Sequence, residues 1–514
     1  MSYNAAVLTR PIQELAERAA SIEAESAHHH ETPLEVNEVV SAVAGTYEKL
    51  RYLLEYREEH TVRRAAIERI IRRRILIEGK NFEGARLVRE LVEGRYMTPA
   101  QATEHLAHES ERIVARFLAL VAWAGEQQRR RLLSFAASEI EAHIERVSHA
   151  LDASVVDAMY QTLRPKTEAS GHSGQEIDTQ LFCACRRALL NTDDEALAYA
   201  LWLAYVPGWQ DNGFANETVG PALPGILAAI RRDVKHGLQW QIVPRIKNEA
   251  IYFRIIREYL ADHPHADFED SRALDLYARE YMARVYAHEH ERIQSSGIRA
   301  VAYLFLTKFL VALGIEAPYE YFILGGISYV PLLTNIFFHP ALLFLLTRGV
   351  GSFTERNTAA VVAGLHTVLH EGAARPVRVR PSYGGLTPLF AVFYLLLILG
   401  IFGGIVGVLQ GLGFNLIGGI LFLFFLSLVL FFAFRIRMRA KRWVVIEERG
   451  VPALLTNALV APIVRVGRYL SRTFSSVNVF VLFMDFILET PFKMLLNFSH
   501  HFLIYLREKA NEVY

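Results

Sequence analysis

The spacing of apolar residues divides the chain into two parts of different character. Up to about residue 297, apolar residues recur three and four positions apart among many charged ones, which predicts amphipathic helices. Beyond Ile298 the apolar residues run together in long stretches. Neither the alternation typical of strands nor an internal repeat stands out. We therefore expect an all-α protein with a soluble multi-helix N-terminal region and a C-terminal membrane region.

Start signals mark several of these helices. Thr32-Pro33-Leu34-Glu35 combines an N-cap threonine, a first-turn proline and a glutamate that completes a capping box, and Thr98-Pro99-Ala100-Gln101 repeats the pattern. The signals and the periodicity together predict helices at about 35–60, 62–78, 83–94, 99–124, 126–160, 225–236, 245–262 and 267–295.

Changes in composition suggest eight segments along the chain. We expect a flexible N-terminal segment at 1–31, a helical domain at 32–163, a linker at 164–177, a second helical domain at 178–297, an apolar, Pro-broken membrane-associated or re-entrant segment at 298–347, a basic cytoplasmic loop at 348–385, a transmembrane hairpin at 386–434 and amphipathic C-terminal helices at 435–514. The linker is inferred from its polar sequence, RPKTEASGHSGQEI, which is rich in turn-forming residues.

The membrane assignment depends on residues 386–434, which contain 49 consecutive positions without a charge. One helix needs about 20 apolar residues to cross a bilayer. The run therefore has room for two spans, with the turn at Gln410-Gly411-Leu412-Gly413, its most polar and flexible point.

A second apolar region precedes the hairpin. Segment 298–314 is apolar except for Arg299 and Lys308, and segment 321–347 has 27 residues without Asp, Glu, Lys or Arg. Pro331 and Pro340 would break a simple spanning helix, so we expect a bent, re-entrant or two-piece element there. Either the two segments cross as a pair or neither crosses, and the sequence favours a partly inserted pair.

Basic residues on both sides of the hairpin set its orientation. The topology-setting residues are Arg375, Arg378, Arg380, Arg435, Arg437, Arg439, Lys441 and Arg442. The positive-inside rule places both ends of the hairpin in the cytoplasm. The chain starts without the basic and apolar regions of a signal peptide, which agrees with this orientation. We expect a multi-pass protein of the cell (inner) membrane with a cytoplasmic N-terminal region and C-terminus.

Glycines in the hairpin recur at spacings that let helices approach closely in lipid. They are Gly400, Gly403, Gly404, Gly407 and Gly411. These glycines serve either the packing of the hairpin on itself or the contact between copies of the chain, although glycine is also common in membrane helices in general.

Signatures of catalysis are scarce. The sequence has no phosphate-binding loop ending in Lys-Ser/Thr, no G-x-S-x-G elbow and no H-E-x-x-H. Glu139–His143 and Glu145–His149 are four residues apart, whereas di-iron bundles use Glu-x-x-His. The two cysteines lack a second pair with which to bind a soft metal. We predict no catalytic residues, no metal and no cofactor.

The most distinctive soluble feature is the basic stretch 62–80, which holds an isoleucine stripe. Such a helix could lie on anionic lipid or meet a phosphate-bearing partner. We favour the alternative, a bundle helix whose arginines pair with nearby glutamates. Since no aromatic residues interleave with these arginines, we expect no nucleic-acid partner.

These observations predict an integral membrane protein with a large cytoplasmic helical module, acting as a non-enzymatic scaffold or membrane-organising component. One alternative is a subunit of an oligomeric transporter or channel, for which Asn335 and His339 are candidate cavity residues. A second alternative is a membrane-bound metal-dependent enzyme. The expected partners are the lipid bilayer, including anionic lipid, and either a second copy of the chain or another membrane protein.

Overall fold

A computed structural model of the chain describes residues 8–26, 59–77, 82–211, 216–266, 268, 271–348, 354–372, 375–379, 387–446 and 460–470. The predicted all-α class is confirmed for these residues, in which two three-residue strands accompany the helices. The helix predicted at 35–60 and most of the C-terminal segment lie outside the described residues. The chain forms two compact units, Met1–Met282 with Glu355–Ser382, and Ala283–Thr354 with Tyr383–Tyr514.

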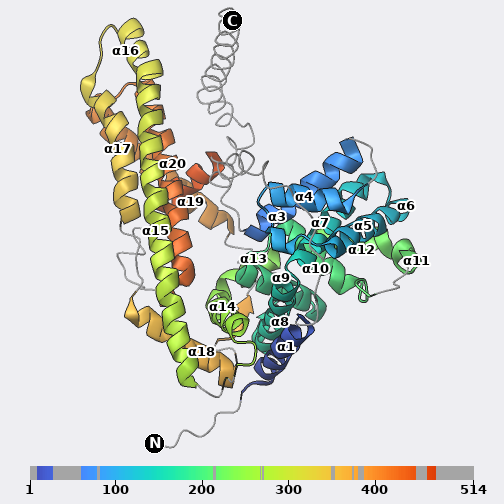
Figure 1. The fold of residues 1–514 in the computed structure, drawn as a ribbon. Coiled ribbons are helices and arrows are strands. Elements are labelled where there is room, and N and C mark those ends of the chain that lie inside the picture. Colours follow the sequence, from blue (N-terminus) through green and yellow to red (C-terminus); the bar gives the residue numbers. More distant parts are fainter. Residues whose placement is uncertain are drawn as a thin grey trace, which may run out of the picture. The chain divides into compact units, whose positions relative to one another are not determined.

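The first unit is a bundle of mostly short helices (Figure 1). Its elements are α1 (Arg10–Ser26), α3 (Glu59–Arg72), α4 (Gly84–Glu93), α5 (Glu104–Ala119), α6 (Val121–Ala124), α7 (Arg129–Ile144), α8 (Arg146–Leu163), β1 (Thr167–Ala169), α9 (Gly174–Leu190), α10 (Asp194–Tyr205), α11 (Asn216–Val219), α12 (Leu223–Val234), α13 (Gly237–Ile242), α14 (Lys247–Asp262), the start of α15 (Ser271–Val311), α18 (Glu355–Glu371) and β2 (Val377–Val379). The helices predicted at 62–78, 83–94, 225–236 and 245–262 recur within a few residues of their predicted bounds. The helix predicted at 126–160 is divided at Glu145 into α7 and α8, and the one predicted at 267–295 continues to Val311 in α15.

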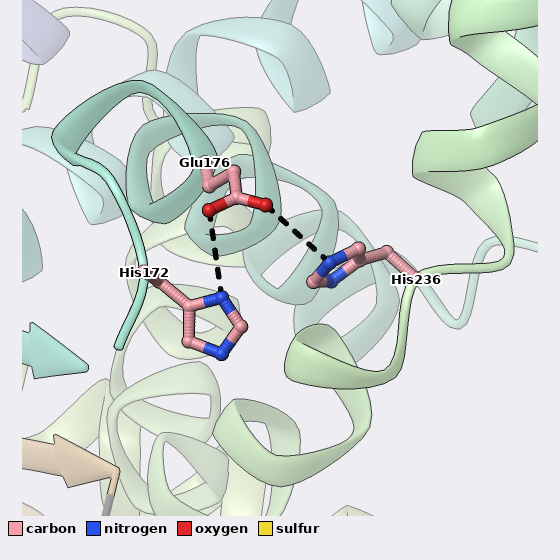
Figure 2. Close-up of side chains that lie close together, drawn as sticks. All are labelled: His172, Glu176 and His236. Atoms are coloured by element: carbon pink, nitrogen blue, oxygen red, sulfur yellow. Dashed lines mark ion pairs between the residues drawn. The ribbon is translucent and has the colours of Figure 1, made fainter. Parts of the chain in front are cut away.

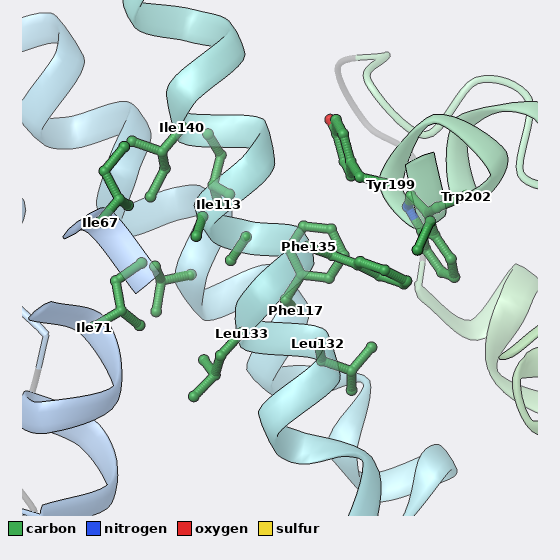
Figure 3. Packing of buried hydrophobic residues seen from close by; sticks show 14 of the residues in the cluster. Ile67, Ile71, Ile113, Phe117, Leu132, Leu133, Phe135, Ile140, Tyr199 and Trp202 are labelled. Carbon is green, nitrogen blue, oxygen red and sulfur yellow. The ribbon is translucent and has the colours of Figure 1, made fainter. Parts of the chain in front are cut away.

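The core of this unit is continuous across the segment predicted as a linker. Buried residues of α3, α5 and α7 pack with residues of α10, which follows that segment (Figure 3). Residues of α12 belong to the same cluster. The rings of Phe117 and Trp209 lie 4.8 Å apart, and those of Trp202 and Trp209 meet edge to face at 4.9 Å. Segment 164–177 itself holds β1 and the start of α9, which Ser173 and Glu176 fix with a capping box.

The N-terminal segment also differs from its prediction as flexible chain, because α1 occupies most of it and packs on α8. Ile12, Leu15, Ala19 and Ile22 are all buried. Their spacing of three and four residues puts them on one face of the helix, which explains why this short segment folds.

The loop between the apolar regions returns to complete the first unit. Helix α18 packs on α14, and β2 pairs in parallel with β1, with Glu168 opposite Arg378. The Thr9 backbone N–H donates to the Leu369 carbonyl over 2.8 Å. The unit is therefore built from two pieces of chain separated by about 70 residues of the second unit.

The second unit contains the long apolar helices. It holds the remainder of α15, a π-helical turn (Ala312–Glu316), α16 (Ala317–Ile323), α17 (Tyr329–Arg348), α19 (Thr387–Gly411), α20 (Leu416–Ala440) and helical residues 460–470. Helix α17 packs along α20, and Leu343 of α17 meets Val429 and Ala433 of α20.

The prolines do not split the second apolar segment, contrary to the sequence-based expectation. Tyr329–Arg348 is one helix with Pro340 inside it. Pro331 lies in the first turn, where its missing N–H would have no intrahelical partner, and Pro340 removes one backbone hydrogen bond. Helices in lipid tolerate such a loss when neighbouring helices pack around it, and Pro340 is buried.

Four helical stretches in the described chain are long and apolar enough to cross a membrane. They are Arg272–Ile323, Tyr329–Thr347, Ala391–Gly411 and Leu416–Trp443. The predicted hairpin is thus present as two such helices joined at residues 412–415. Upstream, the structure has two further candidate spans where the sequence predicted a broken element.

The close approach of α18 to α14 gives a stability test. A Cβ atom added at Gly364 would lie 2.2 Å from the Tyr252 hydroxyl oxygen, and Tyr252 is itself buried. We expect Gly364→Ala to lower the free energy of unfolding by about 1–3 kcal/mol through overpacking. Gly225→Ala in α12 meets no described atom within 4 Å and is expected to have no destabilising effect. Thermal unfolding of the purified full chain in detergent measures both, and equal unfolding temperatures would contradict the packing argument.

Candidate functional site

The second unit buries ionisable and amide side chains among its apolar helices. Lys308, Glu316, Glu320, Asn335 and His339 are each at most 4% exposed. Such residues are rare in membrane helices and mark sites of helix assembly or of ion and solute passage. We define Lys308, Glu316, Asn335 and His339 as the polar cluster.

Asn335 lies at the centre of the polar cluster. Its Oδ1 accepts from Lys308 Nζ over 2.7 Å, and its Nδ2 donates to Glu316 Oε1 over 2.5 Å and to the Gly418 carbonyl over 3.3 Å. One amide therefore connects α15, the π-helical turn, α17 and α20. Because it bridges an ammonium and a carboxylate, the charges of the network balance.

Apolar and aromatic groups surround these charges. Lys308 Nζ lies 4.0 Å from the centre of the Phe425 ring, which supplies a cation–π contact. His339 Nε2 lies 2.9 Å from the Phe422 carbonyl, and its Nδ1 lies 3.3 Å from the Asn335 carbonyl. A neutral imidazole has one N–H, and the shorter distance assigns it to Nε2.

Glu320 ties the ends of the same helices together. Its carboxylate accepts from the Asn415 side chain and from the Ser328 backbone N–H, each over 2.7 Å. Asn415 in turn caps α20 by accepting from the Gly418 N–H over 2.8 Å. The turn before α17 and the turn before α20 are therefore joined by one acid.

This arrangement can do two things chemically. As a satisfied, charge-balanced network, it fixes the rotation and register of α15, α17 and α20 against one another, because other alignments would leave a charge unpaired in an apolar medium. As a chain of titratable groups, it also has the components of a relay for protons or small cations.

The structure brings together only part of what sequence reasoning selected. Asn335 and His339, predicted as cavity residues, meet in one network, but Lys308 and Glu316 were missed as their partners. The available signal was Lys308 itself, since a cation inside an apolar helix requires a buried counter-charge.

Among the described residues, the hairpin glycines form no close contact. A Cβ atom at Gly400, Gly403, Gly404, Gly407 or Gly411 would meet no described atom within 4 Å. Contact between copies through these glycines stays a prediction. One close approach in this unit is at Gly467, where a Cβ would be 2.0 Å from the Ser427 carbonyl oxygen of α20.

The topology-setting residues fall in two places. Arg375 and Arg378 are exposed in the first unit, and Arg378 pairs with Glu168 across the strands over 3.4 Å. Arg435, Lys441 and Arg442 are exposed at the end of α20 and in the turn after it. Nothing is described of Arg380 or of the side chains of Arg437 and Arg439.

Most arginines of the basic stretch pair with acids, as the favoured alternative predicted. Arg63 Nη1 lies 2.8 Å from Glu145, and Arg64 Nη2 lies 2.8 Å from Asp193. Arg73 and Arg74 both bind the carboxylate of Glu90. The stretch is thus largely an internal face of the first unit.

One histidine group in the first unit resembles a metal site (Figure 2). Ligand atoms of His172, Glu176 and His236 all lie within 4.8 Å of one another. However, His236 Nδ1 accepts from the Leu238 N–H over 3.2 Å as the N-cap of α13. A neutral His236 then carries its proton on Nε2, the atom that faces Glu176 at 3.8 Å, so a metal could bind only by breaking the cap.

The electrostatics of this group agree with ion pairing. A hydrogen bond from the Ser173 backbone N–H is the main cause that lowers the pKa of Glu176 below its usual range. Helices α9 and α13 also present their positive N-terminal ends here, which disfavours a bound cation. We interpret the group as two histidines paired to a capping carboxylate.

The Glu-x-x-x-His pairs noted in the sequence do not form metal sites either. His143 Nδ1 bonds the backbone carbonyl of Glu139 over 2.9 Å, and His149 pairs with Glu141. The Glu139 carboxylate instead accepts from Trp209 Nε1 over 2.7 Å inside the aromatic core. Burial raises the pKa of Glu139 above its usual range, although this hydrogen bond and the charge of His143 oppose the shift.

Comparisons with protein-family models, with characterised proteins and with solved structures found no match to this chain.

The polar cluster predicts strong coupling between its two charges. We expect Lys308→Met or Glu316→Gln alone to cost about 3–5 kcal/mol of stability, because each leaves the opposite charge buried without its counter-charge. The double variant should recover most of that loss. Ser427→Ala is the control, since among the described residues its buried hydroxyl bonds within its own helix, to the Leu423 carbonyl. Unfolding of the full chain in mixed micelles measures all four, and losses that simply add in the double variant would contradict the coupling.

Glu139 predicts a pH dependence of stability. The folded protein holds the Glu139 proton more tightly than the unfolded chain, so the free energy of unfolding falls as the pH rises from about 4.5 through the raised pKa. Glu139→Gln keeps an acceptor for Trp209, so it should remove the part of the pH dependence of the free energy of unfolding that Glu139 causes. The variant should then be more stable than the wild type at pH values well above the raised pKa of Glu139. Glu126→Gln, at an exposed side chain, is the charge-matched control. Tryptophan fluorescence during unfolding follows the effect, and an unchanged slope in Glu139→Gln would refute it.

Proposed function

We propose that the chain is a four-span integral membrane protein that holds a helical scaffold module on the cytoplasmic face of a membrane. The observation that carries this proposal is the return of α18 and β2 to the first unit. A bilayer cannot cut through a compact soluble core, so both pieces of that unit must lie on one side. The chain between Met282 and Glu355 therefore crosses an even number of times.

The four candidate spans fit this requirement. Most of Arg272–Ile323 and all of Tyr329–Thr347 lie between the two pieces of the first unit, and the other two candidate spans follow it. This favours a crossing pair over the partly inserted pair expected from the sequence. Arg375 and Arg378 lie between the second and third spans, so the positive-inside rule places the first unit in the cytoplasm.

The scaffold role rests on how the two units are connected. The chain passes between them three times, at Met282/Ala283, Thr354/Glu355 and Ser382/Tyr383. A module that is joined to the membrane unit by three connecting segments has far less freedom of position than one joined by a single flexible linker. Such restraint suits a protein that presents a helical surface to partners, including anionic lipid or a second membrane protein.

A second candidate function is transport of protons or small solutes. It is favoured by the polar cluster, in which Lys308, Glu316 and His339 lie within three helices of the second unit. Only one observation supports it, whereas the scaffold proposal follows from the architecture of both units.

Cysteine labelling tests the topology. In a Cys183→Ala/Cys185→Ala background, single cysteines replace Glu126 and Glu371 in the first unit, Gly326 between the first two spans and Leu412 in the hairpin turn, all of which are exposed. An impermeant maleimide added to intact cells should label positions 326 and 412, and should label 126 and 371 only after permeabilisation.

Labelling of positions 126 and 371 from opposite sides would refute the shared-side topology. Labelling of position 326 together with 371 would show that the upstream pair does not cross. Vesicles reconstituted with the purified chain decide between the two functions, since solute or proton flux above that of empty vesicles would favour transport.

A further inference from the structure

A basic pocket of about 340 Å³ opens in the first unit among α3, α7, α10 and α12. Its cationic side chains are those of Arg72, Arg130, Arg131, Arg231 and Lys235. Two carboxylates, those of Asp194 and Glu195, also line it. The pocket thus has an excess of positive charge in a protein whose net charge is only +1.

Both carboxylates are already engaged. Asp194 Oδ1 accepts from Arg187 Nη2 over 2.6 Å, and Glu195 Oε2 accepts from the Ser134 hydroxyl over 3.0 Å. Arg187 does not line the pocket. Asp194 therefore neutralises the pocket's own cations less, whereas the hydrogen bond from Ser134 leaves the charge of Glu195 in place.

The cations, by contrast, are mostly without counter-charges. Within the described chain, Arg130, Arg131, Arg231 and Lys235 form no ion pair, although Arg231 Nη2 lies 3.5 Å from the Gln128 side-chain oxygen. Arg72 is the exception, because it pairs with Glu68 over 2.5 Å. Elsewhere in the same region, arginines such as Arg63 and Arg64 form ion pairs with acids through their terminal nitrogens.

The guanidinium of Arg131 lies in an electrostatically unfavourable environment. Its Nε atom is buried and has no hydrogen-bond partner among the described residues. Burial lowers the pKa of Arg131, the charge of Arg231 lowers it further, and only Glu195 opposes them. Two like charges held near one another in a partly desolvated site would be relieved by an anion between them.

We propose that this pocket binds a small polyanion that carries phosphate groups. The guanidinium groups of Arg131 and Arg231 offer the planar donor pairs that match phosphate oxygens. The volume suits a small ligand, and the lining offers Val234 as its single apolar side chain, so the ligand is polar throughout. The phosphate belongs either to a soluble metabolite or to the headgroup of a lipid. This proposal concerns the first unit and does not depend on the scaffold function or the topology.

Calorimetric titration of the purified full chain in uncharged detergent with inorganic pyrophosphate tests the pocket. We expect saturable binding that Arg131→Gln and Arg231→Gln each weaken about tenfold or more, the effect of losing one charge-assisted contact. Arg232→Gln is the matched control, because this residue is the next one in α12, is exposed, pairs with Asp233 and does not line the pocket. It should bind pyrophosphate like the wild type.

Stability provides a second readout. Pyrophosphate should raise the unfolding temperature of the wild type and of Arg232→Gln, but not of the pocket variants. If either pocket variant fails to fold, Lys235→Gln, at an exposed position, replaces it with the same expectation. Absence of saturable binding to the wild type, or equal weakening in Arg232→Gln and Arg231→Gln, would overturn the proposal.

The source of the phosphate is distinguished in nanodiscs. If the natural ligand is soluble, pyrophosphate should bind the chain equally well in discs of phosphatidylcholine alone and in discs that also contain phosphatidic acid. If a lipid headgroup occupies the pocket, phosphatidic acid should weaken pyrophosphate binding, and Arg131→Gln should abolish that competition. Either result supports a phosphate site and identifies its source.

Discussion

The fold of this protein depends on a constraint of connectivity, namely that residues 355–379 belong to the same unit as the first 282 residues. Backbone hydrogen bonds between β1 and β2 fix that return in register, and α18 packs on α14 beside them. The apolar helices in between must therefore leave this unit and come back to it. The pair of long helices in Arg272–Ile323 and Tyr329–Thr347 satisfies this constraint.

Within the apolar unit, the buried charges impose a constraint of a different kind. An ammonium and a carboxylate in hydrocarbon are tolerated only when each finds a partner, and Asn335 supplies both with one amide. A purely apolar interface could slide or rotate, since lipid and leucine are equally apolar. The buried charges of the polar cluster thus lower the stability of the unit somewhat, but they select a single defined packing of α15, α17 and α20.

The sequence predicted the parts of the structure that rest on local pattern. The charge-free run 386–434 predicted the hairpin, and three- and four-residue spacing predicted most helices of the first unit. Long-range pairings could not be read in this way: β1 and β2 are three residues each, too short for alternation, and lie over 200 positions apart. Asn335 and His339 stood out as polar residues in an apolar run, but their partnership with Lys308 depends on how two helices align. The basic pocket likewise unites arginines from separate helices.

The discontinuous first unit also has a consequence for the order of biosynthesis. A ribosome that has just made α14 must synthesise about 100 further residues, including two candidate spans, before β2 is available to pair with β1. At typical elongation rates this takes on the order of ten seconds. Throughout that interval, β1 and the face of α14 that α18 will cover stay unprotected. Synthesis of the two long apolar helices therefore precedes completion of the module, and nascent chains stalled at that point would offer a binding surface to chaperones.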